Sequence, residues 1–398
     1  MANKTDFKTV ENSSGDMAEL EEQIRQHRRR TLGRAAAALV IFAVLFVGIQ
    51  LFTALRSYSS FEVLRLTERK DSAATRYASF LGQRVEYSND GIVYYGSGEE
   101  LVWNQSFEMT SPVIDICEGY LVIYDAGGTS LYIMTESGVS KQIETSMPVS
   151  RACVANQGTV AVLMKEDAVS YVRLYDRKGT ELANGEFFQK NGTFPMDIAL
   201  SADAQKLAVC MADVNAGKLR SVISFYNFGS VGQNEIDNNV GTYSYDGLLI
   251  PELDYVSADR MVAFTSEGLL VFEGAQKPAL KRTVEYGVEA RSVFHNSKYV
   301  GITYPNSDVE GSWHIRVYDL NGSVIMENDT TLAYSQVEFL DNNEICVRDS
   351  HRCELFTVHS IHKFSYTFDE ELYKVLSGSG SKNYTLVLEG VTKEVRLK

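Results

Sequence analysis

A unit of four short strands that recurs along the chain constrains the fold more than any other feature of the sequence. One copy has alternating apolar segments at 150–155, 158–164, 170–176 and 180–183. The same four positions are filled between 289 and 331, and in both copies the third segment ends in Tyr-Asp-x-x-Gly. This pattern favours a tight turn, because Asp caps the turn and Gly accepts a positive φ. The repeat therefore predicts an all-β array of similar units.

The repeat divides the chain after residue 60 into units of about 40 residues, a length typical of propeller blades. We expect seven complete units and a three-strand remnant, at 75–108, 111–146, 147–190, 192–247, 248–287, 289–331, 332–370 and 372–398. The alternating segment 61–67 can supply the missing fourth strand, which closes the ring without open edges. The predicted fold is an all-β β-propeller of eight four-stranded blades, with seven as the alternative. A pair of β-sandwiches, the rival architecture, fits this spacing less well.

An apolar run at 35–55 predicts a membrane anchor before the propeller. Gln50 is its one polar amide, and a helix of this length spans a hydrocarbon core of about 30 Å. Arginines cluster just before the run, so the positive-inside rule predicts a cytoplasmic tail at 1–34 and an extracytoplasmic domain at 60–398. A cleaved signal peptide is the alternative, but the region before the run is too long and Phe52 stands where a small side chain is needed. We therefore expect a single-pass protein of the cell membrane.

The charge of the chain limits its partners. The formal net charge is −14, and the first 34 residues carry seven Lys or Arg against six Asp or Glu, so the acidic excess lies in the remainder. Binding to phosphate backbones needs a positive surface, which argues against nucleic acid as a partner. Close adhesion of the large domain to anionic lipid headgroups is disfavoured for the same reason.

Five cysteines occur and none forms a CxxC pair, so the sequence predicts no zinc ribbon or thioredoxin-like site. An odd number without a regular framework is typical of buried thiols, which pack as small hydrophobic groups. One pair allows a second interpretation. Cys346 and Cys353 flank Asp349 and Ser350 symmetrically, so a tight hairpin there would place the two thiols opposite each other. A cross-strand disulfide is the alternative at this pair.

One connection differs from the others in length and composition. The segment 229–247, with the sequence GSVGQNEIDNNVGTYSYDG, is longer and richer in Gly and Asn than the other turns. Long irregular segments in compact domains often carry function, and a surface excursion without a role is the alternative. The candidate interaction residues in this segment are Gln233, Asn234, Glu235, Asp237, Asn238, Asn239 and Tyr243.

Three segments carry a resemblance to a known family. They are 87–91 (YSNDG), 103–109 (WNQSFEM) and 225–237 (FYNFGSVGQNEID), the last of which overlaps the long connection. They are similar to an uncharacterised family of membrane-anchored proteins from clostridia-like Gram-positive bacteria. The resemblance implies a bacterial cell-envelope location and a propeller-like domain outside the membrane. It implies no activity, cofactor or site residue.

The sequence contains no recognisable catalytic constellation. It lacks the GxSxG, HExxH, EF-hand and P-loop patterns. His359 and His362 are three residues apart, which in a strand points them to opposite faces and argues against a shared metal ion. We therefore expect no enzyme and no cofactor, but a membrane-anchored scaffold that binds an envelope protein or polymer. The alternative is an enzyme acting on an envelope polymer with residues scattered over several blades.

Overall fold

The computed structural model describes residues 25, 27, 32–34, 36–46, 48, 56–70, 75–166, 169–188, 192–214 and 217–398. The chain divides into two compact units, residues 1–56 and 57–398.

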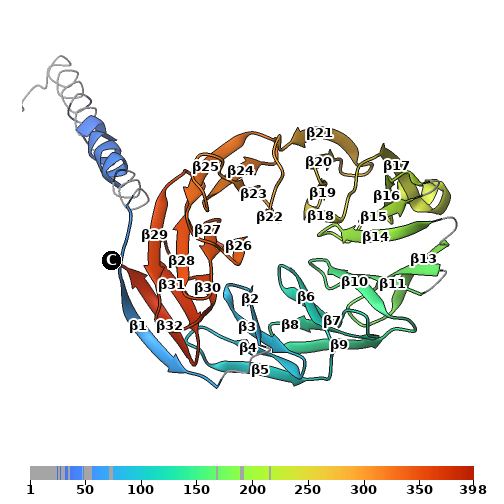
Figure 1. The fold of residues 1–398 in the computed structure, drawn as a ribbon, viewed down its shortest axis with the longest axis horizontal. Coiled ribbons are helices and arrows are strands. Elements are labelled where there is room, and N and C mark those ends of the chain that lie inside the picture. Colours follow the sequence, from blue (N-terminus) through green and yellow to red (C-terminus); the bar gives the residue numbers. More distant parts are fainter. Residues whose placement is uncertain are drawn as a thin grey trace, which may run out of the picture. The chain divides into compact units, whose positions relative to one another are not determined.

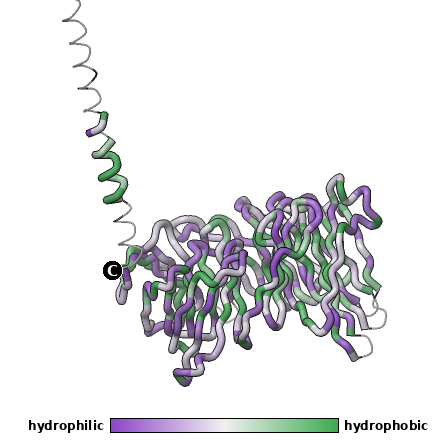
Figure 2. The backbone as a smooth tube through the Cα atoms, turned by 90° about the horizontal axis from the view of Figure 1, so that it is seen from above, coloured by the Kyte–Doolittle hydropathy of each residue, from purple (hydrophilic) through white to green (hydrophobic). Residues whose placement is uncertain are grey.

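In the first unit the described residues are almost all helical, and apolar side chains such as Leu39 and Phe42 are 70% and 69% exposed. The described part of this helix is predominantly hydrophobic (Figure 2). Among the described residues, no helix is both long enough and apolar enough to cross a membrane. Residues 35, 47 and 49–55 of the predicted span lie outside the described residues.

The second unit consists of eight four-stranded antiparallel sheets, numbered here as blades 1 to 8 along the chain. Blade 1 contains β2 (Arg76–Phe80), β3 (Gln83–Ser88), β4 (Gly91–Tyr95) and β5 (Leu101–Ser106). Blade 2 contains β6 (Pro112–Cys117), β7 (Tyr120–Asp125), β8 (Ser130–Thr135) and β9 (Gly138–Glu144). Blade 3 contains β10 (Val149–Val154), β11 (Val160–Lys165), β12 (Val169–Tyr175) and β13 (Glu181–Phe188). Blade 4 contains β14 (Thr193–Leu200), β15 (Lys206–Asp213), β16 (Arg220–Asn227) and β17 (Asn239–Asp246).

The other four blades repeat this order. Blade 5 contains β18 (Glu252–Ser257), β19 (Arg260–Phe264), β20 (Gly268–Glu273) and β21 (Ala279–Glu285). Blade 6 contains β22 (Ser292–His295), β23 (Tyr299–Pro305), β24 (Trp313–Asp319) and β25 (Val324–Thr330). Blade 7 contains β26 (Gln336–Phe339), β27 (Ile345–Arg348), β28 (Arg352–Phe356) and β29 (His362–Thr367). Blade 8 contains β30 (Leu372–Ser377), β31 (Asn383–Leu388), β32 (Val391–Leu397) and, as its outer strand, β1 (Phe61–Glu68).

Figure 1 shows the sheets arranged in a ring, with β6, β10, β14, β18 and β22 toward its centre. The predicted β-propeller is therefore confirmed, with eight blades and not seven.

The ring is closed by strands from the two ends of the domain. β1 pairs antiparallel with β32, from Phe61 opposite Leu397 to Glu68 opposite Val391. The ring of Phe61 also packs edge-on against Tyr366 of blade 7, with centroids 4.8 Å apart. The closure joins the two ends of the domain in one sheet and satisfies an edge of β32 that would otherwise be open.

The core lies between neighbouring blades. The middle strands are buried on both faces, as in β7 and β11, because each sheet is covered by the next one around the ring. Outer strands such as β9 and β21 are mostly exposed. Hydrophobic and hydrophilic residues therefore alternate closely through this unit (Figure 2). Between blades 3 and 4 the apolar cluster includes Leu163, Val172, Leu174, Leu207 and Val209.

Candidate functional site

The irregular connection predicted at 229–247 is shorter in the structure: residues 228–238 form an insertion between β16 and β17 of blade 4, and residues 239–246 form the strand β17 itself. The insertion contains two short 3-10 turns, η2 (Gly232–Asn234) and η3 (Ile236–Asn238). A Cβ atom added at Gly232 would lie 1.6 Å from the main-chain oxygen of Asn227, so the chain can cross itself only at a glycine. A glycine is therefore required at position 232 for steric reasons.

The insertion is tied to its own blade and to blade 5. The Asn227 side chain accepts a hydrogen bond from the Gly229 N–H at 2.8 Å and donates one to the Gln276 main-chain oxygen at 2.8 Å. Glu235 forms an ion pair with Lys277 at 2.6 Å. These contacts hold the insertion in one position relative to the strands around it.

Two adjacent residues of the insertion have left-handed backbone conformations. Asp237 has a φ of 54° and Asn238 a φ of 56°. Asp and Asn tolerate this region better than other residues with a Cβ, but consecutive residues there are uncommon and are maintained only by the surrounding structure. Strained backbone of this kind is often found at binding sites, and both residues line the pocket described next.

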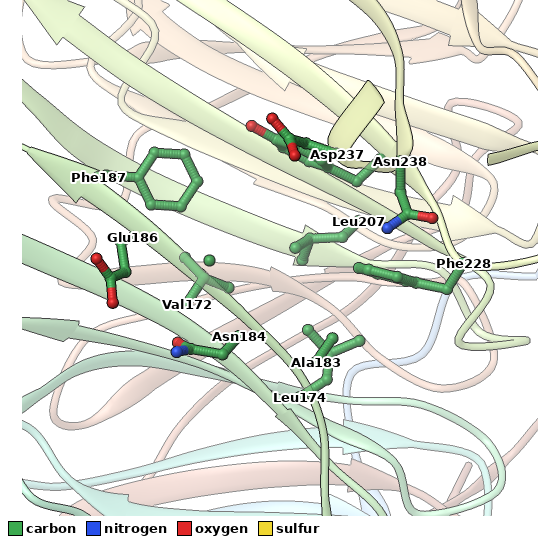
Figure 3. Close-up of a pocket in the computed structure, with 12 residues that line it drawn as sticks. Val172, Leu174, Ala183, Asn184, Glu186, Phe187, Leu207, Phe228, Asp237 and Asn238 are labelled. Carbon is green, nitrogen blue, oxygen red and sulfur yellow. The ribbon is translucent and has the colours of Figure 1, made fainter. Parts of the chain in front are cut away.

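A pocket of about 430 Å³ lies between the insertion and the outer strands of blade 3. We call it the insertion pocket; its residues are Val172, Leu174, Ala183, Asn184, Gly185, Glu186, Phe187, Leu207, Tyr226, Phe228, Asp237 and Asn238. Most of its apolar residues belong to the cluster between blades 3 and 4. In Figure 3, Leu207 and Phe228 lie beside Asn238, and Phe187 stands across from Asp237. The pocket is thus the outer, open end of the core between two blades.

The polar residues of the insertion pocket are acids and amides. Glu186 and Asp237 supply carboxylates, and Asn184 and Asn238 supply amide groups. Among the described residues that line the pocket, none is Lys or Arg. Tyr226 also lines the pocket, and burial raises the pKa of its hydroxyl above its ordinary value, so the side chain stays neutral. The arrangement suits an apolar group that carries or adjoins a positive charge.

The structure places only part of the predicted loop at this pocket. Asp237 and Asn238 line it. The remaining predicted residues, which do not line it, are Gln233, Asn234, Glu235, Asn239 and Tyr243.

Two of these residues, Asn239 and Tyr243, lie on β17 and make contacts elsewhere. The Asn239 side chain accepts a hydrogen bond from the Gly241 N–H at 3.0 Å, and the Tyr243 hydroxyl donates to the Pro278 main-chain oxygen at 3.1 Å. Sequence reasoning missed the blade 3 residues, because the pocket forms only when two blades pack together. The adjacent aromatic residues Phe187 and Phe188 near the end of the predicted unit 147–190 were a signal that the sequence offered.

A second group of ionisable side chains lies on the inner strands at the centre of the ring. An oxygen of Asp115 accepts a hydrogen bond from the Val154 N–H of the next blade at 2.8 Å, and Asp197 accepts one from Leu253 at 2.8 Å. Arg151 faces Asp197 at 3.4 Å. Burial raises the pKa of Asp115 to about 6. These carboxylates are used to join neighbouring blades, and the cavity beside them measures about 70 Å³.

His295 extends this group to blade 6. Its Nε2 lies 3.5 Å from Glu252 and its Nδ1 lies 3.3 Å from Asp254. Burial disfavours the imidazolium, but the neighbouring carboxylates of Asp254 and Glu252 outweigh it and raise the pKa of His295 to about 9. Among the residues that the structure describes, no group of three or more His, Cys, Asp or Glu side chains could hold a metal ion.

The predicted opposite placement of Cys346 and Cys353 is wrong. In the hairpin between β27 and β28, Cys346 pairs with Leu355 and Cys353 pairs with Arg348. The turn is centred one residue later than expected, which moves the register by two and makes the cysteines diagonal neighbours. Both are buried free thiols with Sγ atoms 3.8 Å apart.

Comparisons with known proteins found a matching family model and solved structures of low sequence identity. A family model described as "Family of unknown function (DUF5711)" matches residues 54–397, in agreement with the resemblance to an uncharacterised family. No curated protein matches the sequence. The dipeptidyl peptidase 4 of Porphyromonas gingivalis is 12% identical with a TM-score of 0.54, over 80% of this chain and 56% of that chain. The Pan2 WD40 domain of Neurospora crassa is 9% identical with a TM-score of 0.44, over 86% and 97% of the two chains.

Proposed function

We propose that this chain, which belongs to the family of unknown function DUF5711, is a binding scaffold that docks a partner in the insertion pocket. The single observation that carries the proposal is the pocket itself. Its volume of about 430 Å³ lies in the range of ligand pockets, and its apolar floor and few polar groups match their usual lining. Its rim is a rigidly held insertion, so the site is formed before the partner arrives.

The scaffold is held at the outer face of the cell membrane. This part of the proposal is supported by the apolar run at 35–55 and by the arginines before it. Within the described part of the run, large apolar side chains such as Ile41 and Leu45 are 61% and 59% exposed, and such side chains require an apolar environment.

The partner is an envelope protein or polymer. The acidic balance of the domain disfavours nucleic acid, as do the two carboxylates of the pocket. An enzyme acting on an envelope polymer is the weaker reading. The carboxylates at the centre of the ring already bind main-chain N–H groups, and the adjoining cavity of about 70 Å³ has room for a few water molecules and not for a sugar ring.

Site-specific photo-crosslinking in intact cells tests the proposal. A benzophenone side chain replaces Asn238 at the pocket rim or, as the control, the exposed Glu285 on β21 of blade 5. We expect a discrete crosslinked product from position 238 and none of the same mass from position 285. Adding Ala183→Phe fills the pocket and should remove the product.

Each result has a definite meaning. A product at 238 that survives Ala183→Phe would show contact with the insertion outside the pocket and would refute pocket docking. The absence of any product at 238, with the chain expressed at the normal level, would refute the scaffold role at this site.

A further inference from the structure

The outermost strand of blade 3 forms one side of the insertion pocket. β13 is last in the sheet order β10-β11-β12-β13, and the sheet pairs it with β12 alone among the described strands. Two large apolar side chains on it are exposed, Leu182 at 57% and Phe188 at 56%. An outer strand with exposed apolar side chains is a template on which another extended chain can pair.

The insertion pocket extends along β13. Five consecutive residues of β13, from Ala183 to Phe187, line it. A segment laid along β13 would point alternate side chains toward the same face. One of them would enter the pocket over Val172 and Leu174, which are 2% and 3% exposed and form its apolar floor.

The charges beside β13 determine which kind of segment can bind there. Glu186 lies on β13 and Asp237 faces it from the insertion, whereas Glu181 on the same strand is ion-paired with Arg173 at 3.7 Å. Basic side chains on either side of the apolar anchor would meet these carboxylates. A second copy of β13 carries Glu181 and Glu186 as its only charged side chains, so it supplies no cation for Glu186 and Asp237. The occupant is therefore a segment of a different chain.

From these observations we propose that the partner is a protein that docks as an extended, basic segment. The segment pairs with β13 as a fifth strand of blade 3 and places one large apolar side chain in the insertion pocket. Main-chain hydrogen bonds supply affinity, and the pocket and the carboxylates supply specificity, as in other cases of strand addition. This inference rests on the proposed docking function and adds the class and conformation of the partner.

Three fluorescent heptapeptides test the inference with the full-length chain in detergent. The basic probe is Thr-Lys-Thr-Phe-Thr-Lys-Thr, which presents Lys, Phe and Lys on one face of a strand. The acidic probe has Glu in place of Lys. The third probe has Pro in place of the two Thr residues beside Phe, which removes main-chain donors. Binding is measured by fluorescence anisotropy, and protection of β13 amides is measured by hydrogen exchange.

We expect the basic probe to bind at least tenfold more tightly than the other two and to slow exchange in residues 181–188. Glu186→Lys should weaken the basic probe and strengthen the acidic one, because Glu186 is exposed and its replacement leaves the core intact. The matched variant Glu285→Lys on β21 should change neither affinity.

Equal binding of the three probes, or no binding of the basic probe, would overturn the inference. Binding that Ala183→Phe abolishes, but that leaves exchange in β13 unchanged, would also overturn strand addition while retaining pocket docking. Failure of the docking function itself would instead appear as the loss of the crosslinked product at position 238.

Discussion

A buried charge cluster joins blade 7 to blade 8, the sheet that closes the ring, and its disruption tests the fold directly. Lys363 on β29 is 2% exposed and donates hydrogen bonds to Glu344, to the Ser381 main-chain oxygen and to the Tyr384 hydroxyl, the last at 2.8 Å. The Tyr384 hydroxyl in turn donates to the second oxygen of Glu344. Glu344→Ala removes the only carboxylate among these groups.

The expected cost follows from burial. Removing one partner of a buried ion pair costs about 3–5 kcal/mol, because the other charge is left uncompensated. Glu344 is 8% exposed, so water replaces its carboxylate poorly. Glu327→Ala is the matched control, since Glu327 pairs with Arg316 at 2.7 Å but its side chain is 60% exposed. Surface pairs of this kind contribute about 0–1 kcal/mol.

Urea unfolding of the full-length chain in detergent, followed by tryptophan fluorescence, measures both effects. Glu344→Ala should lower the midpoint far more than Glu327→Ala. Combining it with Lys363→Met should restore much of the loss, because no unpaired ammonium then remains in the core. If the two single variants lost the same stability to within about 1 kcal/mol, the assignment of a tightly buried pair would be wrong.

Three further predictions concern the insertion, the centre of the ring and the cysteines. Gly232→Ala should displace the insertion and abolish binding of the basic probe, with little change in the unfolding midpoint. The control Gly119→Ala, with open space at its Cβ, should change neither the binding nor the midpoint. His295 has a folded pKa of about 9, above its ordinary 6.5, so the stability that its charge contributes is complete below about pH 6.5 and is lost as the pH rises through 9. The urea midpoint should therefore fall over this pH range, and His295→Gln should make the midpoint less dependent on pH. Alkylation should label neither Cys346 nor Cys353 in the native chain and both after denaturation without reductant; labelling that needs reductant would establish a disulfide instead.

The blade boundaries were predictable because strands and turns are encoded locally. Alternating apolar residues and Tyr-Asp-x-x-Gly turns mark them without any knowledge of packing. The unit predicted at 147–190, for example, contains β10 to β13, which run from Val149 to Phe188. The closing strand was predictable for a related reason, since a three-strand remnant requires a fourth strand from elsewhere.

The register of the cysteine hairpin shows where local reasoning ends. The symmetry of Cys346 and Cys353 about two turn-forming residues suggested opposite positions. The structure centres the turn on Ser350 and His351 instead, as the pairing of Arg348 with Cys353 requires. A turn displaced by one residue shifts the strand pairing by two residues. Both registers bury the same faces of the two strands, so the hydrophobic pattern cannot distinguish one register from the other.

The sequence by itself determined a closed β-propeller, with eight blades favoured over seven, and the position of an unusual insertion, because each depends on residues close together in the chain or on a simple count of strands. Only the tertiary structure decided what the insertion faces. Phe187 and Asp237 come from different blades, fifty residues apart, and form one pocket because blades 3 and 4 pack side by side. Packing between repeats brings together side chains whose spacing in the sequence carries no periodic signal, so the site appears only in the folded ring.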